Sequence, residues 1–292
     1  MQRQLRFMTS SVALSFTLFA GAAFAQTQQV PPTPPTPPHP PTPPIQEEYK
    51  PKVGQAGKDA VWVPTSPELV QKMLDLAKVQ PSDFVIDLGS GDGRNIIAAA
   101  KRGVRGRGVE FNQDLVDYSN RLAKSEGVGD KATFVQGDMY AADISDATVL
   151  ALFLLPQNLD KLAQKFLDLK PGSRIVANTF GMTGWKPDVS EQIDGDCTNW
   201  CTALLWIVPA KVDGAWMLGQ NEMKLTQVYQ TFSGTVTVNG KALPIEDGRL
   251  RGDQVTFSAG GSTYEGRVSG DRMEGTFTAT GKATPWRATR RP

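Results

Sequence analysis

Three acidic side chains provide the groups in this sequence that are best suited to chemistry. Asp87, Glu110 and Asp138 each stand at the end of a short apolar run, or just beyond it. Carboxylates accept hydrogen bonds and attract cations, so they can hold hydroxyl groups, amino groups or positive charge on a small ligand. Glu110 follows Asp87 by 23 residues, which suits an acceptor for the two hydroxyls of a ribose. Any one of these acids alone is more simply a solvated strand-end residue, but together they predict a nucleoside-binding site.

A glycine-rich segment follows the first acid. The sequence DLGSGDGRN places Gly89, Gly91 and Gly93 around Ser90, directly after Asp87. Glycine allows backbone conformations that other residues avoid, and it lets a ligand approach the N–H groups at a helix N-terminus. A dinucleotide site has the spacing G-x-G-x-x-G, whereas this chain has G-x-G-x-G. The spacing therefore disfavours an NAD-binding oxidoreductase.

The elements that must position these residues alternate between strands and helices. Continuous apolar runs of β-forming residues are typical of buried parallel strands, and the segments between them favour helices. A further helix is expected after Thr65, which forms a T-x-x-E capping box with Glu68. Five strand-helix units predict an α/β fold with a doubly wound, mostly parallel, Rossmann-like sheet and a ligand at the carboxyl ends of its strands. The expected strands are 84–86, 106–109, 132–135, 149–155 and 174–180, and helices are expected at 95–100 and 158–169.

The composition changes after Val212. Glycines recur between short alternating segments, and the pairs at 239–240, 260–261 and 270–271 are hairpin signals. The pattern predicts a small antiparallel all-β domain of about six to eight strands. We favour a domain that packs against the first one over a dedicated ligand-binding module.

The N-terminus predicts export. Residues 1–25 combine Arg3 and Arg6 with an apolar run and end in Ala-Phe-Ala, as in a cleavable signal peptide. The alternative is a retained membrane anchor, but the apolar run is shorter than the ~20 residues that span a bilayer. Residues 31–44 are proline-rich and favour an extended spacer of roughly 40 Å over a docking site for a proline-binding module. The expected location is the periplasm or the cell envelope.

These patterns divide the chain into four parts. The predicted parts are a signal peptide at 1–25, a proline-rich linker at 26–56, a ligand-binding α/β domain at 57–210 and an antiparallel β domain at 211–292.

Charge and histidine content exclude several functions. Lysine and arginine number 31 against 30 aspartates and glutamates, so no large basic field attracts nucleic acid or an anionic membrane. The single histidine, His39, lies in the proline-rich segment, which excludes His-based triads and multi-His metal sites in the folded body. We therefore expect no metal, no nucleic-acid partner, and membrane contact only through an uncleaved signal segment. The oligomeric state stays open.

The motif D-x-G-x-G-x-G resembles motif I of class I S-adenosylmethionine (SAM) methyltransferases. Further segments are similar to the bacterial relatives of the ATP synthase c-subunit lysine methyltransferase, over about residues 59–210. These segments are VPTSPELVQKML, VIDLGSGDGRNIIAAA, FVQGDMY, LFLLP, LKPGSRIV and GMTGWKPD. The first motif is specific for the superfamily, and the pieces VPT, LLP and GWKPD indicate the narrower family.

The resemblance implies SAM as the cofactor. In the family, the glycine loop surrounds the methionine and ribose portions, and the acid before it lies near the methionine ammonium. Asp138 would then accept from the adenine amino group, with Met139 against the ring. The implied cofactor-binding residues are Thr65, Asp87, Gly89, Ser90, Gly91, Gly93, Glu110, Asp138 and Met139.

The end of the fourth expected strand indicates the acceptor. LFLLP offers no acid or amide to orient a nucleobase or an oxygen nucleophile, which favours methyl transfer to an amine, above all a lysine of a protein substrate. An amine must arrive uncharged, and an apolar channel depresses its pKa. The candidates for such a channel are Trp62, Leu154, Pro156, Phe180 and Trp185, together with Phe153. Each of these apolar residues could instead belong to the hydrophobic core, and no catalytic base is assigned.

A second hypothesis is an exported, non-catalytic envelope protein that keeps the methyltransferase fold while its β domain binds a partner. SAM is made in the cytosol, so an exported chain has no evident supply. Calorimetric titration with SAM and with NAD separates the hypotheses.

Cys197 and Cys201 depart from the resemblance, since no cysteines are expected in this stretch. In an oxidising compartment, a turn brings residues four apart within the Cα limit of about 7 Å for a disulfide. We expect a structural disulfide rather than two free thiols.

Overall fold

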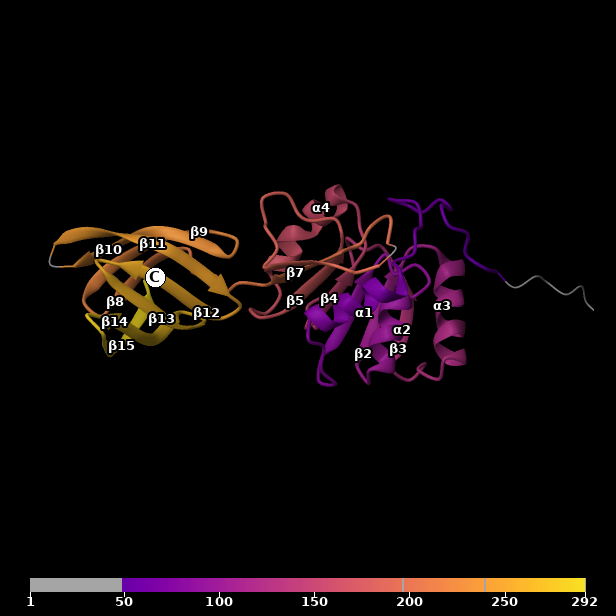
Figure 1. The fold of residues 1–292 in the computed structure, drawn as a ribbon, viewed down its shortest axis with the longest axis horizontal. Coiled ribbons are helices and arrows are strands. Elements are labelled where there is room, and N and C mark those ends of the chain that lie inside the picture. The colour runs from indigo at the N-terminus through magenta and orange to yellow at the C-terminus, as the bar shows by residue number, and fades with distance from the viewer. Residues whose placement is uncertain (1–48, 196, 239, 292) are drawn as a thin grey trace, which may run out of the picture. The chain divides into compact units, whose positions relative to one another are not determined.

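The computed structural model describes residues 49–195, 197–238 and 240–291, which form a mixed sheet with helices followed by a closed barrel (Figure 1). The predicted signal peptide and residues 26–48 of the predicted linker lie outside the described residues, so both stay predictions. No helix in the described part of the chain is long and apolar enough to cross a bilayer.

The first sheet has seven strands in the order β3-β2-β1-β4-β5-β7-β6. Strands β1 to β5 run parallel, β7 pairs antiparallel with β5, and β6 pairs antiparallel with β7. Because β1 has β2 on one side and β4 on the other, the strand order reverses there, and this is where such sheets bind ligands. The bounds are β1 Phe84–Leu88, β2 Arg105–Glu110, β3 Ala132–Gln136, β4 Val149–Leu152, β5 Arg174–Asn178, β6 Val189–Gln192 and β7 Thr202–Ile207.

Four helices cover the two faces of this sheet. They are α1 Pro67–Leu76, α2 Arg94–Lys101, α3 Gln113–Ser125 and α4 Pro156–Leu167. Residues of α1, α2 and α3, such as Leu69, Ile96 and Val116, share one buried cluster with one face of the sheet. On the other face, α4 contributes Leu159 and Phe166 to a second cluster (Figure 1). The expected doubly wound, Rossmann-like α/β fold is confirmed.

Several local predictions were wrong. Among the described residues no helix connects β3 to β4, and a loop covers the sheet there through Met139, Ile144 and Ala147. Strand β4 ends at Leu152 rather than at 155, because Leu155 is already the N-cap of α4 and Pro156 its first residue. Strand β5 ends at Asn178 rather than at 180.

The cap of α1 also differs from the prediction. Ser66, not Thr65, is the N-cap, and its hydroxyl accepts from the Leu69 N–H at 3.2 Å. Thr65 is buried instead, and its hydroxyl accepts from the Asn178 amide at 3.2 Å. Pro67 fixes the first helical position, which shifts the helix start by one residue.

The second sheet is a closed antiparallel barrel in the order β10-β11-β12-β13-β14-β15-β8-β9. Two-residue turns at 260–261 and 270–271 join Ala259 to Ser262 and Ser269 to Arg272, as the hairpin signals predict. The small antiparallel domain is therefore confirmed, but its closure was not predicted. The strands are β8 Gly214–Leu218, β9 Asn221–Val228, β10 Thr231–Val238, β11 Lys241–Arg251, β12 Gln254–Ala259, β13 Ser262–Ser269, β14 Arg272–Ala279 and β15 Lys282–Arg290.

The barrel core consists of the barrel's own apolar side chains. Trp216, Met223, Phe257 and Met273 are among its fully buried members. Eight strands give an interior that side chains can fill. No chemistry is assigned to this core.

Candidate functional site

A cavity lies at the carboxyl ends of the parallel strands, where the strand order reverses. Its wall combines the ends of β1, β2 and β4, the loop after β3 and residues 56–65 of the segment before α1. Eight of the nine predicted cofactor residues line it: Thr65, Asp87, Gly89, Ser90, Gly91, Glu110, Asp138 and Met139.

Gly93 is the ninth, and the structure places it behind the cavity wall. It is the N-cap of α2, with φ 81°, and a Cβ there would lie 2.5 Å from the ring of Phe134. Gly93 therefore allows α2 to pack closely against β3. Gly91, with φ 55°, faces the cavity, and a Cβ there would lie 2.3 Å from Nε1 of Trp62.

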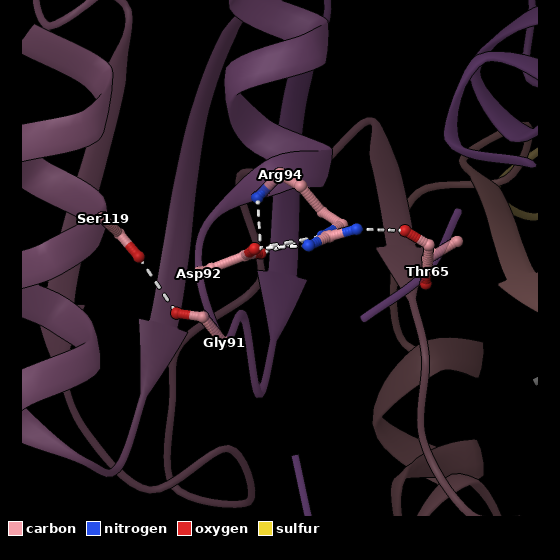
Figure 2. A network of polar contacts seen from close by, with 5 residues as sticks. All are labelled: Thr65, Gly91, Asp92, Arg94 and Ser119. Carbon is pink, nitrogen blue, oxygen red and sulfur yellow. Dashed lines mark hydrogen bonds and ion pairs between the residues drawn. The ribbon is translucent and has the colours of Figure 1, made fainter. Parts of the chain in front are cut away.

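Hydrogen bonds anchor the glycine loop on two sides (Figure 2). On one side, the Arg94 guanidinium binds the Asp92 carboxylate, with Nε at 2.9 Å from Oδ1, and also donates to the carbonyl of Thr65. On the other side, the Ser119 hydroxyl of α3 donates to the Gly91 carbonyl at 2.9 Å. The loop is thus fixed to the segment before α1 and to α3, as a preorganised ligand site requires.

Asp87 is a buried acid that accepts a hydrogen bond from a neighbouring amide. Its side chain is 3% exposed, and its Oδ2 accepts from Nδ2 of Asn95 at 3.0 Å. Burial raises the pKa of the Asp87 carboxyl well above its usual 3.8, and the charges of Glu110 and Asp92 add to this effect. A cation bound beside Asp87 would favour its charged form, so the site suits a positively charged ligand group.

Glu110 is held in place by backbone donors. Its Oε2 accepts from the Gly91 N–H and its Oε1 from the Asn112 N–H, both at 2.9 Å. Because each carboxylate oxygen has two acceptor positions, Glu110 keeps capacity for two further donors. It therefore orders the glycine loop and can also accept from ligand hydroxyls.

Asp138 is paired with a lysine that the sequence interpretation missed. Lys58 Nζ lies 2.7 Å from Oδ2 of Asp138 and 5.0 Å from the centre of the Phe111 ring. Its hydrogen bond to Lys58 lowers the pKa of the Asp138 carboxyl, and the same bond raises the pKa of Lys58. An amino group that binds Asp138 must therefore share it with Lys58. The two residues are 80 positions apart, and no local pattern signals their contact.

One part of the cavity wall is apolar and aromatic, and we call it the acceptor side. Three predicted channel residues, Trp62, Leu154 and Phe180, line it together with Phe153. The sequence interpretation missed Trp200, another wall residue, although its position beside Cys201 could have indicated it. The predicted disulfide between Cys197 and Cys201 is present, with Cα atoms 5.9 Å apart.

Two predicted channel residues lie elsewhere. Pro156 is the exposed first residue of α4 and is not part of the wall. Trp185 is 1% exposed, and its ring stacks on Tyr229 at 5.3 Å between centroids. The Trp185 carbonyl also accepts from Nε1 of Trp206, so this residue belongs to the core.

The cavity fits SAM, the cofactor that the sequence resemblance implies. Three buried polar atoms of lining residues, Ser90 Oγ, Asn95 Oδ1 and Asn158 Nδ2, have no hydrogen-bond partner among the described residues. Five carboxylates and two cationic side chains line the wall, which favours a ligand with sulfonium and ammonium charges. No group of three or more metal-binding side chains occurs in the described parts of the chain.

Comparisons with known proteins identify similar chains. The family model described as "ANTKMT methyltransferase domain" matches residues 87–189. A protein-lysine N-methyltransferase of Saccharolobus islandicus is 38% identical over 151 residues, which cover 50% of this chain and 92% of that protein. The ATP synthase c-subunit lysine N-methyltransferase of Xenopus laevis is 34% identical over 128 residues, which cover 44% of this chain and 56% of that protein.

A solved structure is also similar. It is an RNA methyltransferase from Salinibacter ruber in complex with S-adenosyl-L-homocysteine, with 43% sequence identity and a TM-score of 0.48. The match covers 51% of this chain and 96% of that one. The chain thus spans nearly all of two of these relatives but only about half of the Xenopus laevis protein.

Proposed function

Because the chain belongs to the protein-lysine N-methyltransferase family, we propose that this SAM-dependent methyltransferase acts on the side-chain amine of a lysine in a protein. The observation that carries the proposal is the composition of the acceptor side of the cavity. Phe153, Leu154 and Phe180 line it, and none of these three side chains is an acid or an amide that would orient a nucleobase or a hydroxyl. The Asn158 amide also lines the cavity, but its Oδ1 already accepts from the Tyr140 hydroxyl at 3.2 Å. An amine needs no such partner for its lone pair.

Three of the chain's own carboxylates hold different groups of the cofactor. Asp87 is the acceptor for the ammonium group, Glu110 for the ribose hydroxyls and Asp138 for the adenine amino group. All three carboxylates line the one cavity, which supports this assignment. When bound, SAM supplies a methyl carbon on a sulfonium sulfur, which an uncharged amine attacks while the carbon–sulfur electron pair passes to the sulfur.

Desolvation of the amine is the main contribution of the acceptor side. A lysine side chain in water is protonated and cannot attack. Leu154 is buried, so the amine leaves water as it reaches this residue and its pKa falls. Positioning and desolvation then supply the catalysis, and no general base is assigned.

The test is to identify the atom that receives the methyl group. The purified chain is incubated with SAM carrying an isotopic methyl label and a protein extract, and the products are hydrolysed to amino acids. The expected product is labelled Nε-methyl-lysine, and Glu110→Ala should form far less of it than Arg267→Ala, a barrel control. Label in another amino acid contradicts the proposal. So does label that appears only in RNA when RNA is added to the incubation.

We also propose that the mature protein is exported. The proposal rests on the signal-peptide pattern of residues 1–25, which lie outside the described part of the chain. Cell fractionation followed by N-terminal sequencing should find a periplasmic chain that begins at Gln26. A cytosolic chain that keeps Met1 would contradict export.

A further inference from the structure

Three aromatic rings from separate segments meet in the cavity wall. Phe153 follows β4, Phe180 follows β5 and Trp200 precedes β7. The rings of Phe153 and Phe180 are stacked with centroids 6.1 Å apart, and the rings of Phe153 and Trp200 form a T-shaped pair with centroids 5.8 Å apart. All three line the cavity, and we call them the aromatic wall.

Two residues in or next to this wall have an unusual backbone conformation. Thr179 and Trp200 have φ of 56° and 55°, in the left-handed region that costs non-glycine residues energy. The other described non-glycine residues with positive φ follow a helix or lie in turns and a bulge of the barrel: Lys78, Tyr229, Asp247 and Thr280. Strain outside turns concentrates at functional sites when the surroundings hold it in place.

Covalent and hydrogen bonds hold Trp200 in this conformation. The disulfide joins Cys197 to Cys201, the residue directly after Trp200. The Thr179 N–H donates to the Thr202 carbonyl at 2.7 Å, and the Ile193 N–H donates to the Cys201 carbonyl at 2.9 Å. Trp200 is still 41% exposed, so its ring lies at the mouth of the cavity rather than in the core.

We propose that the aromatic wall binds the ammonium group of the lysine acceptor and of its methylated forms, and that the disulfide is the clamp that positions Trp200. The identity of the acceptor rests on the proposed function, but the preference for an alkylated ammonium rests on the rings alone. Cations bind to the faces of aromatic rings, and quaternary ammonium groups are well suited because they carry little hydration. The wall contains Trp, which is the strongest partner of this kind.

The position of the wall separates two steps. At the mouth, a protonated or methylated lysine keeps its charge and binds to Trp200 and its neighbours. Further in, the buried Leu154 disfavours the charge and favours the uncharged amine that reacts. A lysine that has received one methyl group is then held at the mouth better than an unmodified one, which favours dimethylated and trimethylated products.

Direct binding of a small probe tests the proposal without any methyl transfer. The probe is N-acetyl-trimethyllysine methyl ester, and its control is the isosteric analogue with a neutral tert-butyl group. Calorimetry with the full chain and S-adenosylhomocysteine should show tighter binding of the charged probe. Trp200→Ala should weaken that binding about three- to ten-fold, and Trp200→Phe should restore part of it. Val228→Ala, at an exposed apolar residue of the barrel, should change nothing.

The clamp is tested by a double-mutant cycle. Cys197→Ser with Cys201→Ser should weaken probe binding by a smaller factor than Trp200→Ala, and adding Trp200→Ala to the serine pair should cost less than it does in the wild type. SAM affinity within about two-fold of wild type in every variant shows that the fold is intact. Additive losses overturn the clamp.

Two further results overturn the aromatic site itself: equal affinity for the charged and neutral probes, and an unchanged affinity in Trp200→Ala. Both outcomes are distinct from failure of the proposed function. If the probe binds as expected but no lysine becomes labelled, the lysine assignment fails while the ammonium site stands.

Discussion

Asp87→Asn should change folding stability and SAM affinity in opposite directions. In the chain without SAM, the buried carboxylate of Asp87 accepts from Nδ2 of Asn95, while Oδ1 of Asn95 has no partner among the described residues. An amide at position 87 can still accept from Nδ2 and can also donate to Oδ1, and it removes the buried charge. We expect a gain of about 1 kcal/mol in the free energy of unfolding at pH 7, or about 2–4 °C in Tm.

The pH dependence follows from the raised pKa of Asp87. The folded chain binds this proton more tightly than the unfolded chain, so stability falls as pH rises from about 4 toward the folded pKa. Asp87→Asn does not lose stability in this way. The difference in folding stability between this variant and the wild type should therefore grow between pH 5 and pH 8. Thermal unfolding at both pH values measures it, with the exposed Asp117→Asn as the control.

SAM binding should respond in the opposite sense. Asp87→Asn loses a charge-assisted hydrogen bond to the ammonium group, which should weaken SAM binding about 10- to 150-fold in calorimetry. A variant that binds SAM as tightly as the wild type, or one that is less stable at pH 8 without SAM, would refute this account of Asp87.

Three further substitutions test other parts of the site. Glu110→Ala leaves the Gly91 N–H and the ribose hydroxyls without an acceptor, so SAM binding should weaken about 5- to 150-fold by calorimetry with circular dichroism unchanged; unaltered affinity contradicts the assignment. Gly91→Ala places a Cβ 2.3 Å from Nε1 of Trp62 at a left-handed φ, so SAM affinity should fall at least ten-fold in calorimetry. An affinity equal to that of the wild type would contradict this prediction, because it would show that Trp62 moves aside without cost. Ser66→Ala removes the cap on Leu69 and should cost about 1 kcal/mol in chemical denaturation without affecting SAM affinity, and no measurable loss would contradict the cap.

The meeting of the predicted cofactor residues in one cavity was largely predictable because these residues follow strand ends. A parallel sheet brings the carboxyl ends of its strands to one edge, so Asp87, Glu110 and the loop at Asp138 were expected to meet from sequence order alone. Gly93 was assigned to the cofactor because it belongs to the same motif, but its missing Cβ makes room for Phe134. The motif shows that glycine is needed there and does not show which neighbour needs the space.

The parts that were missed depend on contacts between distant segments. Lys58 reaches Asp138 across 80 positions, and the Trp185 ring packs on Tyr229 of a barrel turn. The barrel closes through Leu218 opposite Ala288, a pairing that no hairpin signal predicts. Local propensity locates turns and strand ends, whereas these pairings depend on how the whole chain packs.

Calorimetric titration of the purified chain with SAM, and separately with NAD, tests the central claim most directly. The account predicts saturable binding of SAM in the cavity that contains Asp87 and Glu110, together with no detectable binding of NAD. Absence of SAM binding at millimolar concentration, or binding of NAD in its place, would contradict the assignment of this cavity as a methyltransferase site.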